Sequence, residues 1–183
     1  MSTARATLPP IPRSEIDDPG LRALIARTDE TGVGDSRFVR LMAYVPGYAE
    51  ALHDALDRSL MEGEVDHGLK EVVRIQLARL AGDPYFAAFR SKRALEDGLT
   101  EERIEAGCGN FETDDRFTPA EKWALRYGWL MYRAPEKVDK AFYDEGKTHY
   151  SEAQIVELGA FIAFHYGMQI FLSTLDLPAE EGA

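Results

Sequence analysis

The sequence predicts an all-α fold, a single-domain helical bundle, from three observations. Apolar side chains recur at the spacing of one helix face, as at Leu52, Leu56 and Leu60. Helix-start signals recur along the chain, in which a Ser, Thr or Asp stands before a proline or three residues before a Glu or Gln. No stretch alternates convincingly between apolar and polar residues, and no hairpin turn signal is present.

The N-terminal part, residues 1–35, is expected to form a proline-rich arm, followed by a helical domain over residues 36–183. Four prolines between positions 9 and 19 exclude a continuous helix in the arm. One short helix is predicted at Leu21–Thr28, before the break at Gly32-Val33-Gly34. The apolar spacing then predicts two further helices, over 37–44 and 46–62.

The middle of the chain is expected to carry two helices joined by a tight turn. Asp66 is the expected N-cap of a helix that runs to Leu80 and ends at Gly82, since glycine commonly follows a helix end. Asp83 and Pro84 then start a second helix, as an N-cap acceptor followed by proline at the first helical position. This second helix is predicted as one unit over 84–97.

Four more helices are predicted in the second half. Thr100 caps a short helix to about Ala106. The capping boxes that begin at Thr118 and Ser151 open two long helices. The last three expected helices cover 118–132, 138–150 and 151–175.

Composition excludes several classes of partner. The chain has 183 residues and a formal net charge of −11, which argues against nucleic acid and anionic membranes. Its single cysteine, Cys108, excludes an internal disulfide and suits a reducing cytoplasm, where we expect the protein to reside. The apolar run Ile155–Leu172 contains Glu157, His165 and Gln169, so we interpret it as a buried soluble helix.

The segment Leu69–Leu99 resembles the core motif of the carboxymuconolactone decarboxylase and alkylhydroperoxidase D superfamily. That motif is a Glu, eleven residues, then C-x-x-C-x-x-x-H; here Glu71 is kept, whereas Asp83, Phe86 and Arg90 occupy the two cysteine positions and the histidine position. Segments such as YVPGYAEAL, FTPAEKWALRYGWLM and the last helix extend the resemblance over most of the chain. The resemblance implies an alkylhydroperoxidase D-like helical fold and a homo-oligomer (a dimer, trimer or hexamer).

Three residues are candidates for catalysis. Glu71 is expected in a partly apolar setting that raises its pKa, the property of a proton-transfer group; a surface pair with Arg74 or Lys70 is the alternative. Tyr85 could donate a hydrogen bond to an oxyanion or be a core aromatic. His165 could move protons at physiological pH or be a satisfied core residue.

Five residues are candidates for substrate binding. Arg90 could hold a carboxylate through its guanidinium. Lys92 and Arg93 add positive charge beside it; the alternative is that they pair with acidic neighbours on a solvated helix face. Asp83 is a general acid or base whose pKa the helix N-terminus should lower, or simply an N-cap. The remaining three candidates are Phe86, which can shape or dry the pocket, His67 and Gln169.

These residues suggest a cofactor-free lyase resembling carboxymuconolactone decarboxylase, acting by proton transfer on a small anionic, carboxylated ring- or lactone-derived substrate. No metal site and no cofactor are expected: Glu145 and His149 form a single ligand pair, which is too few for a site. A catalytically inactive ligand-binding or assembly protein on the same scaffold is the alternative. A thiol peroxidase is disfavoured, because it requires a cysteine pair.

Overall fold

The structure, a computed structural model, describes residues 8–31 and 36–175. Within these residues there are helices and no strand. The helices up to the motif region are α1 (Pro19–Thr31), α2 (Ser36–Met42), α3 (Pro46–Met61), α4 (His67–Ala81), α5 (Pro84–Ala88) and α6 (Lys92–Glu96). They are followed by α7 (Glu101–Cys108), α8 (Pro119–Arg133), α9 (Lys140–Gly146) and α10 (Glu152–Ser173). Three short 3-10 turns are η1 (Arg13–Glu15), η2 (Phe111–Thr113) and η3 (Pro135–Lys137).

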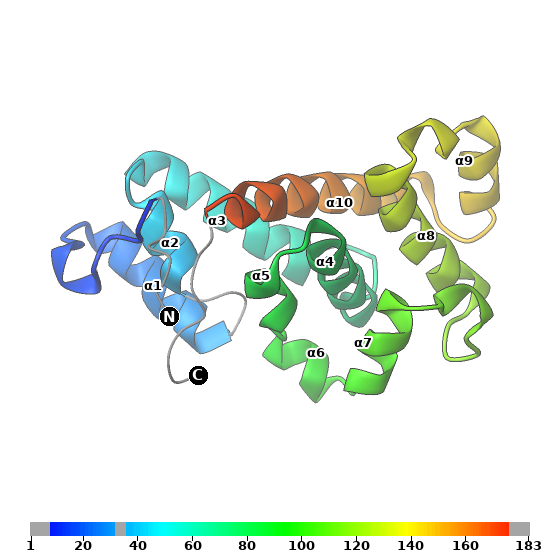
Figure 1. The fold of residues 1–183 in the computed structure, drawn as a ribbon, viewed down its shortest axis with the longest axis horizontal. Coiled ribbons are helices and arrows are strands. Elements are labelled where there is room, and N and C mark those ends of the chain that lie inside the picture. The colour runs from blue at the N-terminus through cyan, green and yellow to red at the C-terminus, as the bar shows by residue number, and fades with distance from the viewer. Residues whose placement is uncertain (1–7, 32–35, 176–183) are drawn as a thin grey trace, which may run out of the picture.

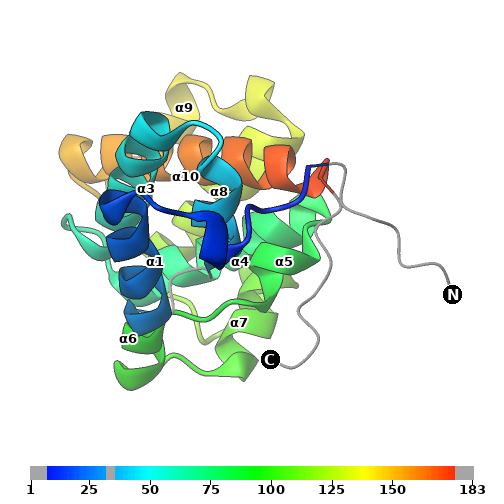
Figure 2. The same ribbon diagram turned by 90° about the vertical axis from the view of Figure 1, so that its left-hand side faces the viewer.

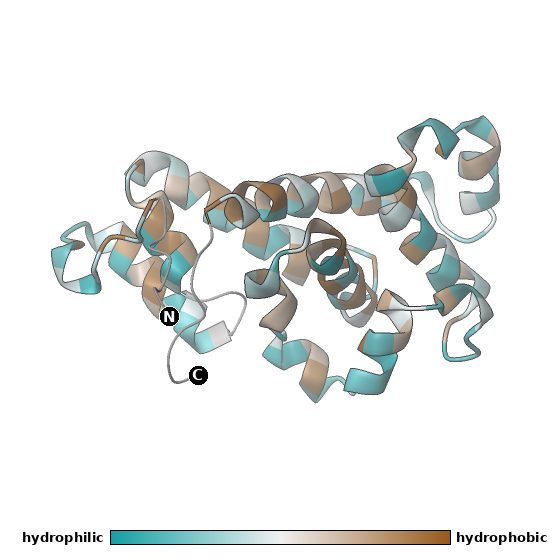
Figure 3. Cartoon of the chain, viewed as in Figure 1, coloured by the Kyte–Doolittle hydropathy of each residue, from teal (hydrophilic) through white to brown (hydrophobic). Residues whose placement is uncertain are grey.

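The central helix of the fold is α4. It packs most extensively against α10, and then against α8 and α7. Figure 1 shows α10 running along the length of the molecule, from the α1–α3 group at one end to α8 and α9 at the other. Figure 2, viewed from the first end, shows α1 to α3 grouped together, and Figure 3 shows brown, hydrophobic stretches on α4 and α10.

The core has two clusters of apolar side chains. One surrounds Trp123 and joins α4, α7, α8 and α10, while the other joins α1, α2 and α3 to α5 and the end of α10. The second cluster contains Ile25, Phe38 and Phe86. The arm and domain division at residue 35 stays a prediction, and the Gly32-Val33-Gly34 break lies outside the described residues.

The predicted N-caps are confirmed. Asp66 accepts a hydrogen bond from the Leu69 amide at 2.8 Å, and Gly82 ends α4 in the left-handed conformation, with φ of 66°. In both capping boxes, at Thr118 and Ser151, the two reciprocal hydrogen bonds between the N-cap residue and the third helical residue are present.

The predicted single helix over 84–97 is wrong, because the chain breaks it into α5 and α6. Phe89 is extended, with ψ of 148°. Arg74 donates to the carbonyls of Phe86 and Phe89 at 2.7 and 2.8 Å. In a continuous helix these carbonyls would instead accept from backbone amides of the next turn. Ser91 then caps α6 with its side chain. The predicted helix over 138–150 is also shorter than expected, since only Lys140–Gly146 is α-helical there.

By length and composition, α10 could cross a membrane, and 39% of its most apolar window is buried inside the protein. Its buried side chains, among them Leu158, Phe161 and Ile162, belong to the main core cluster. Its outer face is apolar as well and carries Ala153, Val156, Ala160, Ala163, Gly167 and Phe171, all exposed. Such a continuous exposed apolar stripe is unusual on a monomer.

Candidate functional site

Glu71 and Arg74 form a buried ion pair at the centre of the motif region. Glu71 is fully buried, and Arg74 donates from Nε to Oε2 and from Nη2 to Oε1, both at 2.8 Å. The Ser91 amide adds a third hydrogen bond to Oε1 at 2.8 Å. The alternative pairing with Arg74 is therefore the observed one, but inside the core rather than on the surface.

The expected rise in the pKa of Glu71 is wrong. Burial alone would raise this pKa, but the charge and hydrogen bonds of Arg74 and the Ser91 amide outweigh burial and lower it. A carboxylate held ionised in this way is a poor proton donor near neutral pH. Its geometry serves instead to hold the segment between α5 and α6 against α4.

His67 joins the same network from the start of α4. Its Nδ1 donates to the Leu60 carbonyl at 2.9 Å, because a carbonyl only accepts. Its Nε2 lies 2.8 Å from the Ser91 hydroxyl, which can donate to it in the neutral tautomer. Sequence reasoning missed Ser91, although a serine before the helix-forming run KRALE is an N-cap signal.

Asp83 caps α5 as the alternative interpretation held. Its Oδ1 accepts from the amides of Tyr85 and Phe86 at 3.0 and 3.4 Å. The predicted lowering of its pKa is wrong: burial raises the pKa, against those two backbone hydrogen bonds. Its second oxygen, Oδ2, is buried and has no hydrogen-bond partner among the described residues.

Tyr85 and Phe86 are core aromatics. The Tyr85 ring meets Phe89 edge-on at 4.9 Å between centroids and Phe86 at 5.0 Å, and the Arg37 guanidinium lies over it at 4.6 Å. Phe86 also lies 6.4 Å from Phe38 on α2. Phe86, at the second cysteine position that the resemblance implies, is therefore part of an aromatic cluster in the core.

Arg90 has its donors engaged within the chain. Its Nε and Nη2 bind the two oxygens of Glu101 at 2.7 and 3.0 Å, and Nη1 donates to the carbonyls of Ala87 and Phe89. The neighbouring cations are bound too: Lys92 donates to the Glu30 carbonyl at 2.6 Å, and Arg93 pairs with Asp97 at 3.6 Å. A carboxylate ligand would have to displace Glu101 from Arg90.

His165 lies in the α3–α4–α10 interior. Its Nε2 is 3.3 Å from the Ser59 hydroxyl, which itself donates to the Leu56 carbonyl and so accepts from the histidine. Burial, reinforced by the positive charge of Arg74, lowers the pKa of His165 to about 3. The expectation that it moves protons at physiological pH is therefore not supported by its environment.

Gln169 and Glu157 lie on the same side of α10 as His165, four and eight residues away from it along the helix. Gln169 Nε2 donates to the Arg74 carbonyl at 3.0 Å, while its Oε1 is buried without a partner among the described residues. Glu157 forms an ion pair with the buried Lys70, which also donates to the Ser59 and Glu62 carbonyls at 3.0 and 2.6 Å. Glu157 also accepts a hydrogen bond from the Glu64 amide at 2.8 Å, so this side of α10 holds both α4 and the α3–α4 turn.

The structure brings Glu71, Arg74, His67, His165 and Gln169 together at one helix interface, with Asp83 close by at the end of α4. Two surface hollows, of about 410 and 510 Å³, are lined by none of the eight predicted site residues. Over the described ranges, no three His, Cys, Asp or Glu side chains cluster as metal ligands do. Glu145 binds Arg126 instead.

No protein-family model and no functionally curated protein matches the sequence. Solved structures match it closely in shape. The debrominase Bmp8 has a TM-score of 0.79 and 21% identity, covering 98% of this chain and 95% of its own. A cysteine-to-alanine variant of Bmp8, solved with 2,3,4-tribromopyrrole, matches equally well.

Two peroxidase-related proteins also match over nearly their whole lengths. The alkylhydroperoxidase AhpD-core protein from Ralstonia eutropha JMP134 has a TM-score of 0.71 and 12% identity, covering 98% of this chain and 95% of its own. A protein from Silicibacter sp. TM1040 has a TM-score of 0.71 and 13% identity, covering 99% and 96%. These likenesses confirm the fold that the sequence resemblance implied: the chain has the all-α, alkylhydroperoxidase D-like fold and lacks the C-x-x-C motif.

Proposed function

We propose that this chain is a small-molecule-binding protein on the alkylhydroperoxidase D-like scaffold, without thiol redox chemistry. One observation carries the proposal. Glu71, the motif residue that is kept, has both oxygens bound by Arg74 and one also by the Ser91 amide, inside the core. The other motif positions have structural partners of their own, since Asp83 caps α5, Phe86 packs in the core and Arg90 binds Glu101.

The likeness to Bmp8 supports a small planar ligand but no particular reaction. Bmp8 is a debrominase, and its variant was solved with a bromopyrrole. This chain has a single cysteine, Cys108, which stands at the end of α7 and outside the motif segment. Burial raises the pKa of Cys108 to about 11, so it is protonated at neutral pH.

A cofactor-free lyase acting on a carboxylated ring or lactone is the second candidate, and Asp83 favours it. Asp83 combines a raised pKa with an unpartnered buried oxygen at the first cysteine position of the motif. A protonated carboxyl there could donate to a developing dienolate after loss of carbon dioxide. Arg90 would exchange Glu101 for the substrate carboxylate.

A paired binding and turnover assay separates the two candidates. The protein and its Asp83→Asn variant, which keeps the Oδ1 acceptor of the N-cap, are incubated with neutral aromatics and with ring and lactone carboxylates. Thermal unfolding reports binding, and mass spectrometry reports consumption. We expect ligands that raise the Tm and are recovered unchanged. Consumption of a carboxylate by the wild type, and not by Asp83→Asn, would establish the lyase instead.

We also propose that the protein is a cytoplasmic homo-oligomer in which a second copy covers the outer face of α10. Ala160, Ala163 and Gly167 are small, so two such helices could approach closely. An Ala163→Glu substitution should yield monomers in analytical ultracentrifugation, since it places a charge on this stripe. Thr148→Glu, at an exposed position beyond α9, should leave the assembly unchanged. A monomeric wild type would contradict this part of the proposal.

A further inference from the structure

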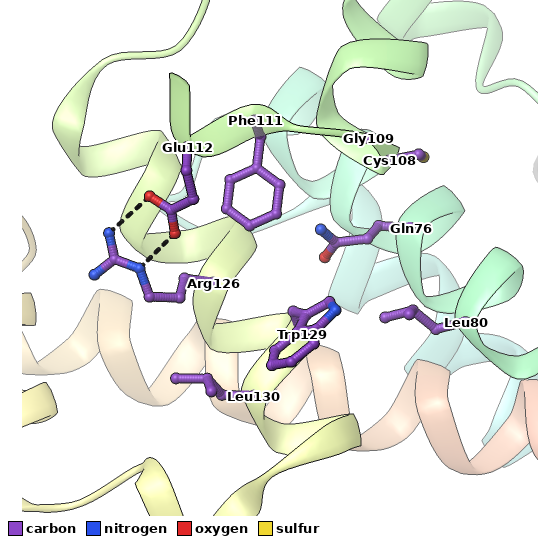
Figure 4. Close-up of a pocket in the computed structure, with 9 residues that line it drawn as sticks. All are labelled: Gln76, Leu80, Cys108, Gly109, Phe111, Glu112, Arg126, Trp129 and Leu130. Carbon is purple, nitrogen blue, oxygen red and sulfur yellow. Dashed lines mark hydrogen bonds and ion pairs between the residues drawn. The ribbon is translucent and has the colours of Figure 1, made fainter. Parts of the chain in front are cut away.

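A hollow of about 410 Å³ lies between the C-terminal end of α4, the end of α7, η2 and α8. Its volume falls in the range of small-molecule sites. Leu80, Phe111 and Leu130 supply apolar walls, and the Trp129 side chain, 40% exposed, stands at the mouth. Figure 4 shows the Gln76 amide pointing into the space between Phe111 and Trp129.

The side-chain oxygen of Gln76 is a hydrogen-bond acceptor that no donor among the described residues satisfies. The residue is 3% exposed, its Nε2 donates to the Gly107 carbonyl at 3.1 Å, and its Oε1 has no hydrogen-bond partner among the described residues. Because a carbonyl only accepts, the nitrogen must face Gly107, and the oxygen is turned away from it. Gly128 leaves room for this oxygen, since a Cβ there would stand 3.2 Å from it. A buried acceptor left unsatisfied is unfavourable and would be relieved by a donor.

The charges at the rim disfavour an anion. Arg126 is the cation that lines the hollow, and it binds Glu112 through Nε and Nη2 at 2.7 and 3.0 Å and Glu145 through Nη1 at 3.0 Å. One guanidinium thus faces two carboxylates, which leaves this group with a net negative charge. A neutral molecule avoids both the repulsion and the need to break these pairs.

We propose that this hollow binds a small, neutral, planar aromatic molecule that carries an N–H or O–H donor. The donor satisfies Gln76 Oε1, and the ring packs on Trp129 and Phe111. Cys108 also lines the hollow and contributes packing. The inference rests on the proposed binding function, for which it names a site and a ligand class.

Indole and benzofuran are matched probes, because they share shape and differ in the N–H donor. Indole is titrated into ¹⁵N-labelled protein, and the two tryptophan side-chain N–H signals are followed. The Trp129 signal should shift. The Trp123 signal should not, because Trp123 is fully buried and donates to the Phe142 carbonyl at 3.1 Å. Benzofuran and indole-2-carboxylate should bind at least about 10-fold more weakly than indole, since one lacks the donor and the other carries a charge.

Two variants test the contacts by calorimetry. Gln76→Met removes the acceptor and should weaken indole binding about 10-fold. Because this change also removes the bond to Gly107, Trp129→Leu provides a second, surface-exposed test and should weaken binding similarly. Tyr48→Leu, at an exposed aromatic on α3, is the control and should bind indole like the wild type.

The inference is overturned if indole leaves the Trp129 signal unmoved, if Trp129→Leu binds it like the wild type, or if benzofuran binds equally well. These results are separate from a failure of the proposed function. Consumption of a carboxylate that depends on Asp83 would defeat the proposed function and leave indole binding intact. If other ligands bind the protein at a different site and indole does not bind, the proposed binding function stands and this inference fails.

Discussion

The guanidinium of Arg74 holds both carboxylate oxygens of Glu71 while two of its nitrogens reach the carbonyls of Phe86 and Phe89. The pair is therefore one junction between α4 and the segment that separates α5 from α6. Such a junction depends on both charges, because either one alone would be left buried without its counter-charge.

Replacing Glu71 with Gln should destabilise the protein by about 3–5 kcal/mol, the usual effect of removing one partner of a buried ion pair. The free energy of unfolding, measured by urea denaturation, checks this. Glu101→Gln is the matched control. This substitution removes the charge that pairs with Arg90. Because the Glu101 side chain is 56% exposed, the free energy of unfolding should change by less than about 1 kcal/mol.

Equal, small effects of the two substitutions would contradict a structural role for Glu71. A catalytic role predicts a different result, namely that Glu71→Gln keeps its stability and loses turnover.

His165 should make stability depend on pH. Its pKa falls from an ordinary value of 6.5 to about 3 on folding, so between these values the unfolded chain binds a proton that the folded chain does not. The stability that neutral His165 contributes is therefore fully present above pH 6.5 and is lost as the pH falls towards 3. From pH 6.5 to 5 the loss should be about 2 kcal/mol.

The comparison of wild type with His165→Gln isolates this contribution, because His53, whose pKa burial also lowers, titrates in both. The variant should show a shallower decline in unfolding free energy between pH 7 and 5. An unchanged slope in His165→Gln would show that folding does not lower the pKa of His165.

Cys108 should react slowly with thiol reagents. With a pKa of about 11, its thiolate fraction at pH 8 is roughly 100-fold below that of an ordinary cysteine. The rate of reaction with a disulfide reagent, compared in native and urea-unfolded protein, measures the difference. Rapid native labelling, or peroxide consumption that Cys108→Ser abolishes, would contradict the absence of thiol chemistry.

Gly146 should not tolerate a methyl group. A Cβ at this position would overlap the ring of Trp123, which is fully buried. Gly146→Ala should therefore destabilise the protein by about 1–3 kcal/mol, as overpacking of cores does. Gly47→Ala is the control: nothing lies within 4 Å of its Cβ, and alanine in a helix should stabilise by about 0.5–1 kcal/mol. Thermal denaturation of both variants decides the point.

Local chemistry predicted where helices begin, because an N-cap such as Asp66, Thr118 or Ser151 acts within its own turn. It did not predict the break at Phe89, since that break is held by Arg74, fifteen residues earlier. Propensity in the segment around Arg90 favours helix, and a tertiary contact overrides it.

The candidate site was also predictable only where its contacts are local in the sequence. The pairing of Glu71 with Arg74 follows from their separation of three residues on one helix. The directions of the pKa shifts of Glu71 and Asp83 do not, because they depend on burial and on partners brought by other segments. The Gln76 hollow gave no motif, since its walls come from four separate elements.

The charged residues buried on α4 each bind a different part of the chain: Lys70 binds the α3–α4 turn and Glu157, Glu71 binds Ser91, and Arg74 binds the end of α5. Single replacements at these positions should therefore be poorly tolerated during divergence, whereas coordinated ones preserve the balance of charge. Homologues should consequently keep or exchange Glu71 and Arg74 as a pair, and likewise Lys70 and Glu157. Covariation at these positions would then record a constraint of architecture, even in lineages whose ligands differ.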